Sequence, residues 1–149
     1  MRYSCVTPCL NSEKYIEETM LSVLTQSVFQ TQEFSLYYVV QDGGSSDGTI
    51  EIVQRLIERY SDRDNIEVRV VSERDSGMYD AVAKGFERGV DSDVYSYINA
   101  GDFYAPQAFS IVAELFAGNS VRFLTGLNVV YNEKSQMVGC DLPFEYNKN

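Results

Sequence analysis

Strand-like and helix-like segments alternate four times along this chain, and short polar connections join them. The predicted order is strand 2–7, helix 13–24, strand 34–40, helix 50–60, strand 66–71, helix 78–86, strand 94–98 and helix 106–118. Strands that alternate with helices form right-handed crossovers and pair in parallel. The pattern therefore predicts an α/β fold whose mainly parallel sheet is flanked by helices on both faces.

The end of the chain carries a different pattern. Two β-prone segments, 121–131 and 136–140, flank the polar residues Asn132 to Ser135, which predicts a hairpin. A length of 149 residues is near the usual size of one compact domain. We therefore expect a single domain over residues 1–149.

Histidine is absent from this chain. Its absence excludes Ser-His-Asp and Cys-His catalysis, imidazole metal ligands and a histidine general base within these residues. The net charge is −10, which argues against a non-specific grip on nucleic acid or anionic lipid. Acid–base or metal chemistry would have to come from carboxylates, lysine, tyrosine or water.

The three cysteines, Cys5, Cys9 and Cys140, form no CxxC pair, and we interpret them as reduced, structural thiols. No apolar run approaches the ~20 residues of a membrane span, and no signal peptide precedes the first strand. These features predict a cytoplasmic protein without a membrane span in this chain, free in solution or at the inner face of the membrane.

Polar clusters follow each of the four predicted strands. They are Thr7–Asn11, Asp42–Asp47, Glu73–Asp75 and Asn99–Asp102. Ligands of open parallel sheets bind at the carboxyl ends of the strands. We therefore expect these clusters to meet at one edge of the sheet and to form a binding site.

Each cluster also has a simpler interpretation. The segment from Asp42 to Gly48 can be a glycine-rich turn into a helix, and it matches neither the dinucleotide nor the P-loop fingerprint. An aspartate at such a strand end can alternatively accept hydrogen bonds from a base or a ribose. Lys84 can pair with Asp80 one helical turn away or point at phosphates. Asp102 can close a plain turn or bind Mg²⁺ or Mn²⁺ together with phosphate oxygens and water.

Four ordered segments carry a resemblance to a known family. The segments TPCLNSEKYIEETMLSVLTQS, VVQDGGSSDGT, SERDSGMYDAVAKG and YINAGDFY resemble the donor-binding half of a family 2 glycosyltransferase with the GT-A fold. The likeness covers roughly residues 3–116. It is greatest to bacterial enzymes that build lipopolysaccharide O-antigen, capsule and exopolysaccharide.

The resemblance implies donor-binding roles for particular residues. Pro8 to Asn11, with Thr7 alongside, would pack on the nucleotide base, and Leu10 would replace a stacking tyrosine found in many members. Asp42 would accept a hydrogen bond from the base, usually uracil. Asp75 and Lys84 would flank the ribose and the diphosphate. Asn99 to Asp102 stand at the family's D-x-D position, where Gly101 replaces a carboxylate and Asp102 keeps the metal role.

The resemblance further implies transfer of a sugar from a nucleotide-diphospho-sugar to a saccharide or lipid-linked acceptor. Among such donors it favours a UDP-sugar. Such transfer would be inverting and would depend on Mn²⁺ or Mg²⁺. No residue of the chain matches the family's catalytic base, which we expect in an acceptor-binding part beyond residue 149. The alternative is a nucleotide-binding module without turnover. A sugar-1-phosphate nucleotidyltransferase is disfavoured because residues 7–15 offer only Lys14 for a triphosphate.

Overall fold

The computed structural model describes residues 1–118 and 121–141. These described residues fall within two compact units, which span Met1–Ala113 and Glu114–Asn149. The first unit contains a four-stranded sheet and the second contains a two-stranded one. Residues 121–141 are largely exposed, and those of them that form strands, 128–131 and 137–141, pair with each other.

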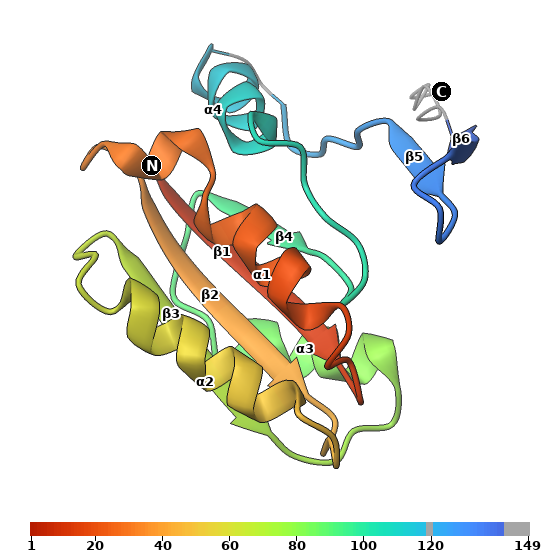
Figure 1. The fold of residues 1–149 in the computed structure, drawn as a ribbon. Coiled ribbons are helices and arrows are strands. Elements are labelled where there is room, and N and C mark those ends of the chain that lie inside the picture. The colour runs from red at the N-terminus through yellow and green to blue at the C-terminus, as the bar shows by residue number, and fades with distance from the viewer. Residues whose placement is uncertain (119–120, 142–149) are drawn as a thin grey trace. The chain divides into compact units, whose positions relative to one another are not determined.

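The first unit follows the predicted alternation. Its elements are β1 (Arg2–Cys9), α1 (Ile16–Leu24), the 3₁₀ helix η1 (Ser27–Gln30), β2 (Ser35–Asp42), α2 (Thr49–Tyr60), β3 (Ile66–Ser72), α3 (Met78–Glu87), β4 (Val94–Tyr97) and the start of α4 (Ala108–Gly118). The strands pair in parallel in the order β3-β2-β1-β4 (Figure 1). The predicted fold class, a parallel α/β sheet flanked by helices, is confirmed.

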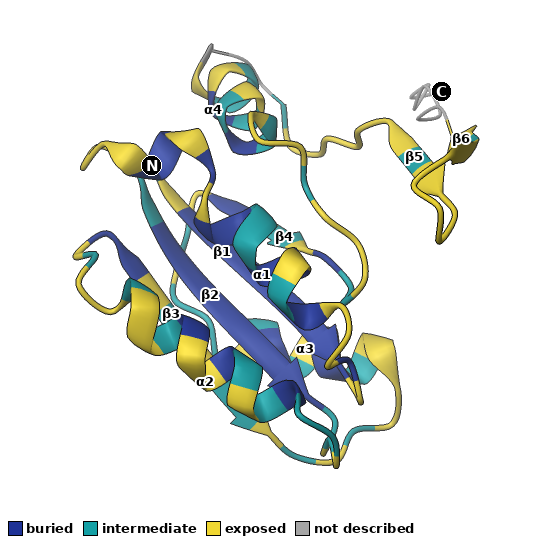
Figure 2. Cartoon of the chain, in the orientation of Figure 1, coloured by how far each residue is buried: buried dark blue, intermediate teal, exposed yellow. Residues whose placement is uncertain are grey.

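Both faces of the sheet are covered. Val6, Tyr37 and Val39 form a buried cluster on one face, and Phe86 of α3 packs against it. On the other face the ring of Tyr3 stacks on Phe109 with their centroids 5.0 Å apart. Helices α1 and α2 lie across this second face (Figure 1). Burial on both sides explains why β1 and β2 are dark along almost their whole length in Figure 2.

The first strand continues past Pro8, where the sequence predicts its end. Cys9 accepts a hydrogen bond from the Gly43 amide at 2.9 Å on the β2 side of the strand. The Pro8 carbonyl points to the other side, where it accepts from the Ala100 amide at 3.4 Å. The missing N–H of Pro8 therefore falls beside β4, which has already ended at Tyr97, and it interrupts no bond to β2.

The first helix begins later than its pattern predicts. We expect Asn11 or Ser12 to cap it, yet α1 starts at Ile16 after a turn. The Ser12 amide donates instead to the Thr49 hydroxyl at 2.7 Å, and the Asn11 side chain accepts from the Ser46 amide at 2.9 Å. Contacts between two loops thus replace the local cap.

The second unit contains the predicted hairpin in a shorter form. Strands β5 (Asn128–Tyr131) and β6 (Met137–Asp141) pair antiparallel, and residues 121–127 belong to no regular element. Among the described residues, no helix has the length and apolar character needed to cross a membrane.

Candidate functional site

The carboxyl ends of the four parallel strands meet as expected. The loops that follow them, residues 10–15, 43–48, 73–77 and 98–107, form what we call the strand-end rim. The register pairs Cys9 with Asp42 and Asp42 with Ser72, which aligns the ends of the three strands that carry them.

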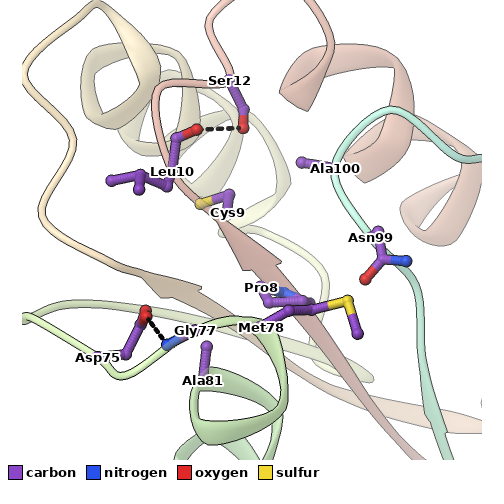
Figure 3. A pocket seen from close by; sticks show the side chains of 10 residues that line it. All are labelled: Pro8, Cys9, Leu10, Ser12, Asp75, Gly77, Met78, Ala81, Asn99 and Ala100. Carbon is purple, nitrogen blue, oxygen red and sulfur yellow. Dashed lines mark hydrogen bonds between the residues drawn. The ribbon is translucent and has the colours of Figure 1, made fainter.

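A pocket of about 290 Å³ opens at the strand-end rim (Figure 3). Its lining residues are Pro8, Cys9, Leu10, Ser12, Asp75, Gly77, Met78, Ala81, Asn99 and Ala100. Four of these, Pro8, Leu10, Asp75 and Asn99, are predicted site residues. Asp75 and Asn99 lie on opposite sides of the pocket in Figure 3.

Cys9 and Ala100 also line the pocket and fall inside the predicted ranges Pro8 to Asn11 and Asn99 to Asp102, whereas Met78 and Ala81 were not predicted. Met78 and Ala81 belong to the apolar stripe of a helix, and that pattern predicts core packing. Met78 is nevertheless exposed, and it forms a wall of the pocket together with Ala81. Cys9 reads as a structural thiol. Met78 and Ala81 carry no polar or charged group, so the sequence alone gives no sign that they line a binding site.

Asp42 lies behind the pocket instead of lining it. None of its surface is exposed, and its carboxylate accepts hydrogen bonds from the amides of Gly44 at 3.1 Å and Ser45 at 2.9 Å. The hydroxyls of Ser72, at 2.6 Å, and Ser45 also donate to it, as does the Cys9 thiol at 3.7 Å. Burial raises the pKa of Asp42, but the hydrogen bonds from Ser45, Ser72 and Gly44 outweigh burial and hold this pKa below its ordinary value.

Thr7 and Asn11 hold the structure around the pocket without lining it. The Thr7 hydroxyl is buried and shares a hydrogen bond with the Tyr38 hydroxyl at 2.7 Å. The backbone of Asn11 has a φ of +48°, and its amide donates to the Ser45 hydroxyl at 2.7 Å. Through Asn11 the first loop of the strand-end rim is tied to the second.

The same two loops exchange further bonds through acidic side chains. Asp47 accepts from the Glu13 amide at 3.1 Å, and Glu13 accepts from the Gly48 amide at 2.9 Å. Asp47 also accepts from the Thr49 amide at 3.1 Å at the start of α2. Burial raises the pKa of Asp47, but the hydrogen bonds from Thr49 and Glu13 together outweigh it and hold this pKa below its ordinary value. An acid near a helix N-terminus is favoured by the exposed amides there.

Lys84 is engaged with its own helix and the preceding loop. Its Nζ lies 2.9 Å from Asp80 Oδ2 and donates to the Arg74 carbonyl at 3.1 Å. The bond to Asp80 raises the pKa of Lys84. Of the two interpretations of Lys84, the local ion pair is therefore present, and the lysine does not line the pocket.

Asn99, Gly101 and Asp102 form the fourth loop of the strand-end rim. Gly101 has a φ of +107°, which favours glycine, and its amide donates to the Thr19 hydroxyl at 2.9 Å. Asp102 is exposed, and its Oδ2 lies 3.5 Å from the Asn99 side-chain amide. The carboxamide oxygen of Asn99 is buried and has no hydrogen-bond partner among the described residues.

The donor set at Asp102 fits only one kind of divalent metal site. The described residues contain no group of three or more acidic, histidine or cysteine side chains that could hold a metal. Mg²⁺ is commonly bound by one or two carboxylates, with phosphate oxygens and water as the remaining ligands. Asp102 fits such a ligand-completed site, since it is an exposed carboxylate on the strand-end rim.

Cys9 lines the pocket, but its thiol donates to Asp42 and is not activated. Burial, followed by the negative charge of Asp42, raises the pKa of Cys9 well above its ordinary value. The thiolate is the nucleophilic form of cysteine, so a raised pKa suppresses nucleophilic attack. Cys5, Cys9 and Cys140 are all free thiols, in agreement with the sequence interpretation.

Comparison with known proteins identifies related chains. The model of the family described as "Glycosyl transferase family 2" matches residues 4–137. Among curated proteins, hyaluronan synthase of Streptococcus pyogenes is 26% identical over 125 residues. That match covers 84% of this chain and 29% of the synthase, so the chain spans under a third of the length of this relative.

Solved structures share the fold of the first unit. S. aureus TarS is 28% identical with a TM-score of 0.59, and the match covers 76% of this chain and 19% of TarS. TarS 1–349 in complex with UDP-GlcNAc is 26% identical with a TM-score of 0.55, covering 76% of this chain and 30% of that one. The mannosyltransferase PcManGT from Pyrobaculum calidifontis, in complex with GDP-Man and Mn²⁺, is 18% identical with a TM-score of 0.65. The match covers 89% of this chain and 36% of PcManGT. This last likeness concerns the fold alone.

Proposed function

Because this chain belongs to glycosyl transferase family 2, we propose that its pocket binds a nucleotide-diphospho-sugar, with UDP as the nucleotide. The protein would transfer the sugar to a saccharide or lipid-linked acceptor with inversion. The TarS complex with UDP-GlcNAc supports the choice of UDP, since the matched part of TarS has a similar fold and is 26% identical to this chain. The cytoplasmic location expected from the sequence belongs to the same proposal.

The observation that carries this proposal is the position and composition of the pocket. It lies at the carboxyl ends of a parallel sheet, where open α/β proteins bind ligands. Its walls are mainly apolar, from Pro8, Leu10, Met78 and Ala81, with the polar groups of Asp75 and Asn99 on opposite sides. Apolar walls with a few placed polar groups are typical of small-molecule sites.

Eight of the predicted site residues take three kinds of role under this proposal. Pro8, Leu10, Asp75 and Asn99 contact the donor, because they line the pocket. Thr7, Asn11 and Asp42 hold the strand ends and loops in place through the hydrogen bonds described above, and Lys84 neutralises Asp80 beside the third loop.

A divalent cation would complete the site. Asp102 would hold Mn²⁺ or Mg²⁺ beside the diphosphate, and a bound cation would neutralise the charge that develops on the leaving nucleoside diphosphate. Asn99 would orient Asp102 through its side-chain amide. The backbone of Gly101, anchored on Thr19, would keep this loop at the strand-end rim.

The test uses calorimetric titration of UDP together with a pocket variant. Leu10→Glu adds a negative charge at the pocket beside a ligand that is itself an anion. We expect UDP affinity to fall at least about tenfold. Ile111→Glu is the matched control, because Ile111 is 54% exposed against 57% for Leu10 and does not line the pocket.

Three results are distinguishable. Loss of affinity in Leu10→Glu alone supports the pocket as the donor site. No binding of UDP, GDP or ADP by the wild-type chain, or equal affinities of the two variants, overturns the assignment. An assay for UDP released from UDP-GlcNAc then separates an enzyme from the alternative, a nucleotide-binding module without turnover.

A further inference from the structure

Two aspartates near the pocket differ in how much of their hydrogen-bonding capacity is already used. Asp42 accepts five hydrogen bonds from protein donors and has no exposed surface. A carboxylate offers about four lone-pair sites, so no position is left for a ligand donor. Asp75 lines the pocket, and its Oδ1 accepts from the Gly77 amide at 2.8 Å (Figure 3). Its Oδ2 has no hydrogen-bond partner within the described part of the chain.

Gly43 provides the space that Asp75 occupies. A Cβ atom at position 43 would lie 2.7 Å from Asp75 Oδ2 and 3.5 Å from Leu10 Cδ1. Its backbone does not require glycine, because positive φ values among the described glycines occur at Gly44, Gly77 and Gly101. The lack of a side chain at Gly43 therefore allows the Asp75 carboxylate to lie close to the backbone at this position. It brings the free carboxylate oxygen beside Leu10, the apolar wall of the pocket.

We propose that Asp75, and not Asp42, is the residue that selects the nucleobase of the donor, a step that rests on the proposed function. Asp75 Oδ2 accepts a hydrogen bond from the ring N3–H of uracil while the base packs against Leu10. Oδ1 keeps its bond to Gly77, which fixes the carboxylate. Asp42 is then a positioning residue that shapes the turn at Gly43 to Ser45. This assignment differs from the base contact at Asp42 that the sequence resemblance implies.

A cycle of two changes isolates the proposed hydrogen bond. UDP and N3-methyl-UDP, which lacks the N3–H donor, are titrated into the wild-type chain and into Asp75→Asn. In the variant an NH2 group, which only donates, replaces the second oxygen, so the atom facing the base cannot accept from N3–H while the remaining oxygen stays bound to Gly77. For the wild type we expect methylation to weaken binding about tenfold or more, a loss appropriate to a hydrogen bond to a charged group. In Asp75→Asn the two ligands should bind within about twofold of each other, and UDP should bind more weakly than to the wild type.

A relocated carboxylate provides an independent readout. Asp75→Ala should lose the discrimination against N3-methyl-UDP, and the double variant Gly43→Asp with Asp75→Ala should regain part of it. The new side chain starts 2.7 Å from the place of the lost oxygen. A change of fold alone would not restore preference for the N3–H donor. Asp62→Ala is the control for loss of one negative charge, since Asp62 is exposed and follows α2, away from the strand-end rim.

The outcomes separate this inference from the proposed function. If the wild type binds UDP but Asp75→Asn keeps the full penalty for N3-methylation, Asp75 does not read the base and the donor site stands. The same conclusion follows if Asp42→Asn, with an intact fold by circular dichroism, loses the penalty while Asp75→Asn keeps it. If the wild type binds no uridine nucleotide, the proposed function itself fails.

Discussion

Asp42 keeps a negative charge in a place with no exposed surface, and this arrangement has consequences for stability. Burial favours the neutral acid, whereas the hydrogen bonds from Ser45, Ser72 and Gly44 favour the carboxylate. The net effect is a pKa below the ordinary value of 3.8. A carboxyl group with a lowered pKa stabilises the folded state above its unfolded pKa, and that stabilisation is lost as the pH falls through the folded pKa.

We therefore predict that Asp42→Asn lowers the free energy of unfolding by about 2–4 kcal/mol at pH 7, because donors that now meet a charged acceptor become poorly paired. Urea denaturation at pH 7 and at about pH 3 provides the measurement. The wild type should lose more stability than the variant between these values, since only the wild type carries the carboxylate. A difference between the two proteins that is independent of pH would contradict the assigned ionisation.

The sequence predicts the carboxylates of the strand-end rim but not which of them a ligand can reach. Asp42 ends β2 in register with Cys9, and it is fully buried and does not line the pocket. Asp75 stands three residues beyond β3, where the path of the loop decides its direction. That path depends on tertiary contacts, the bond to Gly77 and the space above Gly43, which no local pattern encodes.

The contact of α3 with the sheet depends on a glycine. A Cβ atom at Gly85 would lie 2.4 Å from one γ-carbon of Val6 and 3.0 Å from the other. Val6 is fully buried, and its cluster also packs against Phe86 of α3. The helix can therefore lie this close to β1 only without a side chain at position 85.

We predict that Gly85→Ala destabilises the protein by about 1–3 kcal/mol, the usual cost of overpacking a core. The substitution would otherwise be favourable, since alanine is about 1 kcal/mol better than glycine within a helix. Thermal and urea denaturation measure the net effect. Adding Val6→Ala should make the Gly85→Ala change less costly than it is in the wild type, because the shortened side chain removes the clash.

Ala83→Gly on the exposed side of the same helix serves as the comparison, and it should show the helix-propensity cost alone. If Gly85→Ala stabilises the protein, the helix must move away from Val6 at little cost, and the close packing is not a constraint.

At the scale of secondary-structure elements, the presence and type of each element could be predicted from the sequence, but the residues at which it begins and ends could not. The alternation of strands and helices follows from hydrophobic periodicity, which is a property of each segment. The ends depend on what another segment supplies. Pro8 is tolerated within β1 because β4 has already ended beside it. Ser12 does not cap α1, because its backbone is bound to Thr49 and the N-cap position falls at Tyr15.

At the scale of the whole molecule, the parallel order of the strands explains why the site could be located from sequence. Every strand of the first unit points the same way, so each following loop arrives at the strand-end rim. The prediction needed no knowledge of individual contacts. The second unit had no comparable rule, because its hairpin is short and largely exposed, and residues 121–127 lack the regular structure that their β-prone pattern favours.

The overall charge of the chain makes the proposed metal testable. A diphosphate would approach a protein of net charge −10, near Asp75 and Asp102, while Lys84 is already paired with Asp80. Like charges oppose such binding unless a cation intervenes. We predict that UDP binds at least about tenfold more weakly in chelator than in Mn²⁺, whereas uridine, which lacks phosphates, binds with the same affinity in both.

Asp102→Asn should remove the Mn²⁺ enhancement and leave the melting temperature unchanged, because the side chain is exposed in a loop. Asp62→Asn supplies the matched loss of charge away from the strand-end rim, and it should retain the enhancement. Calorimetry with UDP and uridine, with and without chelator, measures all of these affinities. Equal UDP affinity in chelator and in Mn²⁺ for the wild type would remove the metal from the site. Neutralisation of the diphosphate would then fall to backbone amides and to Arg74, whose side chain lies 3.9 Å from the Cβ position of Gly44.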